Sequence, residues 1–110
     1  MYRVTKRFEI SAAHSLTLNY ESPCTRLHGH NWQIEITCES EALNENGMVY
    51  DFTKLKRFVT EQLDHQNMND VLSINPTAEN LSRWIADAIG PECVRVRLIE
   101  AEGNIAEYER

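Results

Sequence analysis

Two stretches of this 110-residue chain alternate apolar and polar side chains with a period of two, and this pattern restricts the fold more than any other feature. The first covers residues 2–14 and the second residues 28–38. Successive side chains of a β-strand point to opposite faces of the sheet, so each stretch predicts a half-buried strand. Residues 15–27 then form the loop that joins the two strands.

Two later stretches have the spacing of helices. Apolar residues recur three and four positions apart over residues 52–63, where either Asp51 or Thr53 can be the N-cap. They recur again between Thr77, a good N-cap, and Gly90-Pro91, which ends the pattern. The first stripe consists of Phe52, Leu55, Phe58, Val59 and Leu63. The tail alternates, turns near residues 102–104 and returns, as in a hairpin. The order ββ-αα-ββ predicts an α+β fold, with an antiparallel sheet and two helices on one face.

The length and composition narrow the function. The chain is long enough for one small domain over residues 1–110. A net charge of −6 argues against nucleic acid as a partner. The apolar runs are too short to cross a membrane, no signal peptide precedes the first predicted strand, and three cysteines suit reduced thiols. We therefore expect a cytoplasmic protein with no membrane partner.

Three of the four histidines lie at strand positions that share a face. His14 has the parity of the apolar side of the first strand, and His28 and His30 have that of the second. Residues i and i+2 of a strand are about 6.5–7 Å apart, so two imidazoles can lean onto one ion. Three imidazoles with an open fourth position are typical of a catalytic zinc site. The alternative is a cluster of hydrogen-bonded structural histidines.

Cys24 and the remaining histidine admit several interpretations. Cys24 is either a fourth metal ligand or a free thiol beside the metal that acts as a nucleophile or base. The spacing does not separate the two. Asp64-His65 can form an oriented acid–base pair, although neighbours in sequence often point apart. Cys38 and Cys93 are most simply core residues.

Several motifs occur together along the chain. They are F-x-x-S-A-A-H ending at His14, C-x3-H-G-H over residues 24–30, LDHQNMN over 63–69, NPTAEN over 75–80, and the glutamate of RVRLIEA over 95–101. In this series the chain resembles the 6-pyruvoyltetrahydropterin synthase / 6-carboxytetrahydropterin synthase family over nearly its whole length. The short Cys-to-His spacing is most similar to that of bacterial 6-carboxytetrahydropterin synthases of queuosine biosynthesis. Ala101 stands where the family usually has Thr, and the segment 70–74 is short.

The resemblance implies the tunnelling fold (T-fold), in which subunits join their sheets into an oligomeric β-barrel. It implies a homohexamer, a dimer of trimers, with active sites between subunits. It also implies one Zn²⁺ per subunit, held by the three strand histidines. Cys24 would be the catalytic thiol, and Asp64 and His65 would be the acid–base pair.

The resemblance also implies a substrate, 7,8-dihydroneopterin triphosphate. Glu100 would anchor the pterin by accepting two N–H bonds. Thr77 and Glu79 are weaker candidates for the pocket, because helix capping explains them equally well. Arg26 either meets the triphosphate or is a surface charge.

The implied reaction is that of a lyase, which forms 6-carboxy-5,6,7,8-tetrahydropterin and releases triphosphate and acetaldehyde. One alternative is the pyruvoyl-forming reaction, which stops before C–C cleavage. The other is a zinc- or pterin-binding protein that is not an enzyme, with Cys24 as a structural ligand.

Overall fold

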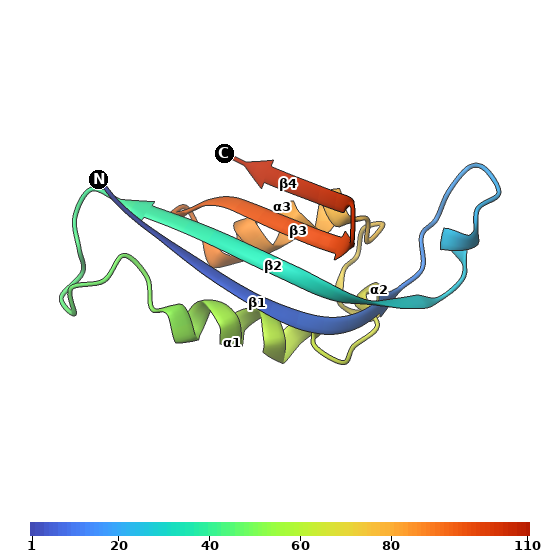
Figure 1. The fold of residues 1–110 in the computed structure, drawn as a ribbon, viewed down its shortest axis with the longest axis horizontal. Coiled ribbons are helices and arrows are strands. Elements are labelled where there is room, and N and C mark those ends of the chain that lie inside the picture. Colours follow the sequence, from blue (N-terminus) through green and yellow to red (C-terminus); the bar gives the residue numbers. More distant parts are fainter.

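The structure is a computed structural model that describes residues 1–110. Its centre is one antiparallel sheet with the strand order β1-β2-β3-β4 (Figure 1). The strands are β1 (Tyr2–His14), β2 (His28–Ser40), β3 (Cys93–Ala101) and β4 (Asn104–Glu109). Both alternating stretches are thus confirmed as strands, and the second extends to Ser40.

Two long helices, α1 (Phe52–Leu63) and α3 (Ala78–Ile89), pack against the sheet. The Asp51 carboxylate accepts from the Thr53 N–H at 2.8 Å, and the Thr77 hydroxyl accepts from the Asn80 N–H at 3.1 Å. The cap predicted at Thr77 is therefore confirmed, and Asp51, not Thr53, caps α1. A third, single-turn helix, α2 (Met68–Val71), was not predicted and adds to the expected α+β fold. A single turn is too short to leave a periodic signal in the sequence. None of the helices has the length and apolar character needed to span a membrane.

The apolar faces of the strands and helices form one cluster of 18 buried residues. Phe8 pairs with Ile34 and Ile10 with Trp32 across β1 and β2, so the predicted stripes meet side by side. Phe52, which the helical spacing assigned to the buried stripe, is instead 48% exposed. It is the first residue of α1, and it lines a surface cavity together with Tyr2 and Val4 at the N-terminal end of β1.

The opposite face of the sheet carries ion pairs and hydroxyls. The Arg97 guanidinium donates to Glu35 at 2.9 Å, and the hydroxyls of Thr5 and Thr37 are 3.0 Å apart. The outer edge of β4, and that of β1 over most of its length, have no neighbouring strand (Figure 1). Unpaired edges of this kind are normally shielded or used for association.

The register of β1 and β2 is regular from end to end, with His14 opposite His28 and Ala12 opposite His30. The two irregularities of the sheet lie elsewhere, at Thr37/Cys38 between β2 and β3 and at Ile99/Ala101 between β3 and β4. No bulge therefore disturbs the parity of the histidines.

Candidate metal centre and active site

His14, His28 and His30 form a compact group, called here the three-histidine cluster, where β1 and β2 meet the loop 15–27. Their ring centroids are 4.6 Å apart for His14 and His28, 5.2 Å for His14 and His30, and 4.9 Å for His28 and His30. One ring nitrogen from each lies within 4.8 Å of the others. Three ligand atoms at this separation are able to bind one metal ion.

Main-chain carbonyls orient two of the rings. The Nδ1–H of His14 donates to the Pro76 carbonyl at 2.8 Å, and that of His28 donates to the Arg26 carbonyl at 2.7 Å. A carbonyl oxygen only accepts, so Nδ1 carries the proton in both rings and the Nε2 lone pair is free. Metal-binding histidines are usually held in this way by a partner on the other nitrogen.

Two Nε2 atoms of the three-histidine cluster have no hydrogen-bond partner. The Nε2 atoms of His14 and His30 are buried and make no hydrogen bond within the protein. Burial, and secondarily the neighbouring imidazole of His28, lower the pKa of His14, against the effect of its bond to Pro76, so this ring is neutral at pH 7. Unsatisfied buried nitrogens cost free energy, and neutral imidazoles are the form that binds transition metals. The cluster therefore fits a resident metal ion.

Glu100 of β3 faces the cluster from the third strand. Its carboxylate oxygens lie 3.8 Å from the Nε2 of His14 and 3.7 Å from that of His30, too far for hydrogen bonds. Glu79, in the first turn of α3, lines the same cavity of about 400 Å³ as Glu100. The structure thus brings these two carboxylates together. Thr77 does not line this cavity and caps α3.

Asp64 and His65 lie beyond the outer edge of β1. The Asp64 Oδ1 accepts from the Ser11 N–H at 2.9 Å, and Oδ2 lies 3.8 Å from the Nε2 of His65. His65 is the only non-glycine residue with a positive φ, 59°, and its side chain is 81% exposed. Side chains held in this left-handed conformation often serve a function, because the backbone strain must be offset elsewhere.

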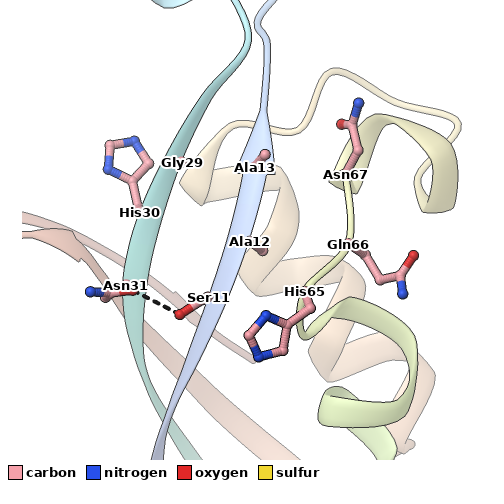
Figure 2. Close-up of a pocket in the computed structure, with 9 residues that line it drawn as sticks. All are labelled: Ser11, Ala12, Ala13, Gly29, His30, Asn31, His65, Gln66 and Asn67. Atoms are coloured by element: carbon pink, nitrogen blue, oxygen red, sulfur yellow. Dashed lines mark hydrogen bonds between the residues drawn. The ribbon is translucent and has the colours of Figure 1, made fainter.

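A shallow cavity of about 500 Å³ crosses the β1–β2 pair, with His65 on one side and His30 on the other (Figure 2). Asn31, which also lines it, accepts from the Ser11 hydroxyl at 2.8 Å. Its amide is thus directed at β1 and not at the imidazoles. The remaining lining residues are Ala12, Ala13, Gly29, Gln66 and Asn67.

Cys24 is exposed in a short 3-10 turn, Pro23–Thr25, within the loop between β1 and β2. Its sulfur does not belong to the group of mutually close metal ligands. Arg26 is also exposed, and its contribution to the site in this chain is its carbonyl, which orients His28.

The carbonyl of Pro76 is a functional group that the sequence pattern did not single out. It lies within the NPTAEN motif, but a carbonyl leaves no chemical signal in a sequence. Only the fold shows that this residue, 62 positions from His14, fixes the imidazole tautomer.

Solved structures share this architecture over nearly the whole chain. The structure of 6-pyruvoyl tetrahydropterin synthase from Caenorhabditis elegans superimposes with a TM-score of 0.77 at 24% identity, covering 99% of this chain and 95% of that one. The α+β fold of β1–β4 with α1 and α3 is therefore the T-fold.

The sequence comparisons agree with the fold. Residues 3–110 match the family described as 6-pyruvoyl tetrahydropterin synthase, and the chain belongs to that family of tetrahydropterin-forming enzymes. It is 38% identical to the 6-carboxy-5,6,7,8-tetrahydropterin synthase of Synechocystis sp., over 98% of this chain and 93% of that one.

The chain is also similar to two proteins from archaea. The dihydroneopterin monophosphate aldolase of Pyrococcus furiosus is 37% identical over 79% of this chain and 74% of its own. A putative 6-carboxy-5,6,7,8-tetrahydropterin synthase of Pyrococcus horikoshii is 52% identical over 62 residues, which are 56% of this chain and 37% of that protein.

Proposed function

We propose that this protein is a zinc-dependent 6-carboxy-5,6,7,8-tetrahydropterin synthase. It converts 7,8-dihydroneopterin triphosphate to the carboxytetrahydropterin with release of triphosphate and acetaldehyde, a lyase reaction of queuosine and 7-deazapurine biosynthesis. The observation that carries the proposal is the three-histidine cluster, with two unsatisfied buried nitrogens, facing Glu100. The similarity to the Synechocystis enzyme supports the choice of product.

One Zn²⁺ per subunit would be held by the imidazoles of His14, His28 and His30. When bound, it supplies a Lewis acid that polarises substrate oxygens and makes the neighbouring C–H bonds more acidic. The carbonyls of Pro76 and Arg26 keep His14 and His28 in the ligating tautomer.

Cys24 acts as the base that removes a carbon-bound proton from the substrate side chain. Its position outside the donor cluster supports a free thiol over a fourth ligand. Asp64 orients His65, which shuttles protons. The main-chain bond from Ser11 to Asp64 holds this pair in place.

The Glu100 carboxylate accepts two N–H bonds from the pterin, and Glu79 lines the same cavity as a second polar contact. Arg26 approaches the triphosphate. Thr77 contributes by capping α3, so its effect on the pocket is indirect.

The active protein is a homohexamer, a dimer of trimers, in which the unpaired edges of β1 and β4 join into a β-barrel. The His65 side chain is exposed beyond the edge of β1, so it serves the site of a neighbouring subunit (Figure 2). We place the enzyme in the cytoplasm, where its three free thiols remain reduced.

Two related reactions compete with this proposal. The pyruvoyl-forming reaction uses the same groups and stops before C–C cleavage. The relative from Pyrococcus furiosus favours a further candidate, aldol cleavage of dihydroneopterin monophosphate.

Product analysis tests the proposal. Zinc-loaded protein is incubated with dihydroneopterin triphosphate or monophosphate, and the pterins are identified by mass spectrometry alongside an acetaldehyde assay. Carboxytetrahydropterin with equimolar acetaldehyde is the expected result. A pyruvoyl product, turnover of the monophosphate alone, or no turnover by zinc-loaded oligomer would contradict it.

A further inference from the structure

The outer edge of β1 is paired, near its C-terminal end, with the segment that follows α1. The Ser11 N–H donates to Asp64 at 2.9 Å, the Ser11 carbonyl accepts from the His65 N–H at 2.7 Å, and the Ala13 N–H donates to the Gln66 carbonyl at 3.0 Å. This short ladder takes the place of a neighbouring strand along alternate residues of β1.

Beyond His14 the ladder continues through two asparagine side chains. The Ser15 N–H donates to Asn69 Oδ1 at 2.8 Å, and Asn69 Nδ2 donates to the Ser15 carbonyl at 2.9 Å. Asn75 binds Thr17 in the same way, at 2.9 Å and 3.0 Å. A primary amide presents a donor and an acceptor side by side, so each asparagine imitates the peptide group of a missing strand.

The residue between these two contacts bonds to the Cys24 segment. The Leu16 N–H donates to the Cys24 carbonyl at 2.9 Å. In extended backbone, successive residues direct their N–H and carbonyl groups to opposite edges. Holding Ser15 and Thr17 at the outer edge therefore aims Leu16 at Cys24 on the inner edge.

Asn75 is itself held firmly. Its own carbonyl accepts from the Thr77 N–H at 2.8 Å and from Asn80 Nδ2 at 2.9 Å. The next residue, Pro76, accepts from His14 at 2.8 Å. Consecutive residues therefore bind two parts of the site: Pro76 holds His14 of the three-histidine cluster, and Asn75 holds Thr17 of the loop 15–27.

We propose that Asn69 and Asn75 are positioning residues that set the Cys24 thiol relative to the three-histidine cluster. The inference rests on the role proposed above for Cys24. It gives a function to the last asparagine of LDHQNMN and the first of NPTAEN, which the sequence motifs left unassigned. Neither amide needs to touch the substrate, because both act through the backbone of residues 15–17.

Asn69→Ala and Asn75→Ala test the proposal in the zinc-loaded protein. We expect kcat to fall about 10- to 100-fold in each, because small misplacements of a reacting group have effects of this size, while KM changes less than about threefold. Zinc content is expected to remain at the wild-type level. Amide hydrogen exchange of Leu16, followed by NMR, is expected to accelerate about tenfold, since its bond to Cys24 loses its support.

Asn44→Ala is the matched control. The Asn44 side chain also holds main-chain N–H groups, those of Asn46 and Met48, but in the loop before α1. Its kcat and its Leu16 exchange are expected to match the wild type. If Asn75→Ala does not fold, Asn75→Asp retains the acceptor for the Thr17 N–H and loses the donor, and an intermediate effect is expected.

Unchanged Leu16 exchange, or a kcat within twofold of wild type, in both alanine variants would overturn the inference. The exchange measurement needs no turnover. If the wild-type protein failed to convert the pterin substrate, the proposed function would fall, while accelerated exchange would still show that the two amides hold the Cys24 segment.

Discussion

The two ends of the β1–β2 pair share one regular register, but only the end that carries His14, His28 and His30 buries polar atoms without hydrogen-bond partners. Towards the middle and far end, Ile34, Ile36 and Cys38 are fully buried and need only apolar contacts. At the end that carries the histidines, the same parity buries the Nε2 atoms of His14 and His30, and neither of these two nitrogens has a protein partner. The alternation therefore decides which side chains are buried at both ends. The unsatisfied nitrogens distinguish the candidate ligand site from the apolar core.

The cysteines show the same contrast. Cys38 lies opposite Cys93 between β2 and β3, and a hydrogen bond with Cys93 and burial raise the pKa of Cys38, which keeps it a thiol. Cys24 is exposed in the loop beside the three-histidine cluster. The fold thus separates two buried sulfurs from an exposed one, which is the sulfur proposed to react.

Replacing Cys24 or Cys38 should produce the largest difference in kcat between two variants. Cys24→Ala is expected to lower kcat by about 10³-fold or more, as for loss of a general base, with zinc retained. Cys38→Ala is expected to keep kcat within about threefold, because its sulfur only fills the core. Steady-state kinetics and elemental analysis check both. Loss of zinc from Cys24→Ala would mean that the thiol is a ligand.

Replacing histidines separates metal binding from proton transfer. His30→Ala is expected to reduce zinc from about one ion per chain to less than about a tenth, since a catalytic site needs three protein ligands. His65→Ala is expected to keep its zinc and lose about 10²-fold in kcat. Elemental analysis of protein purified without a histidine tag measures the zinc content of both variants, and steady-state kinetics measure kcat. Zinc retained by His30→Ala would show that the cluster is not the metal site.

Substitutions in the apolar core between β1 and β2 should lower the free energy of unfolding. Ile36→Ala is expected to lower the free energy of unfolding by about 2–5 kcal/mol, because it leaves a cavity in a fully buried position. Leu43→Ala is its control, because that side chain is 41% exposed in the loop after β2, and should change stability by less than about 0.5 kcal/mol. Urea unfolding measures both. Equal effects would contradict the described core.

The polar face of the sheet should show the smallest effect. Arg3 donates to Glu39 at 2.6 Å, but the arginine side chain is 65% exposed. Arg3→Ala is expected to cost less than about 1 kcal/mol in urea unfolding, because solvent screens the pair. A larger loss at the concentration of the oligomer would show that this face is buried by association.

The sequence predicted much of this arrangement because period-two and helical patterns record burial directly. His14 falls opposite His28 as the parity implies. The helix α2 was not predicted because it has only one turn. Phe52 was wrongly assigned to the buried stripe because helical spacing does not show whether the first residue of a helix is covered. The roles of Pro76, Asn69 and Asn75 depend on contacts across more than 50 residues, which no local pattern encodes.

Zinc K-edge X-ray absorption of the loaded protein tests most directly whether the histidine end is a metal site with the thiol outside it. The expected spectrum has a nitrogen and oxygen shell at about 2.0–2.1 Å with imidazole scattering, and no sulfur. A sulfur neighbour at about 2.3 Å, or zinc that does not bind, would contradict the separation of Cys24 from His14, His28 and His30.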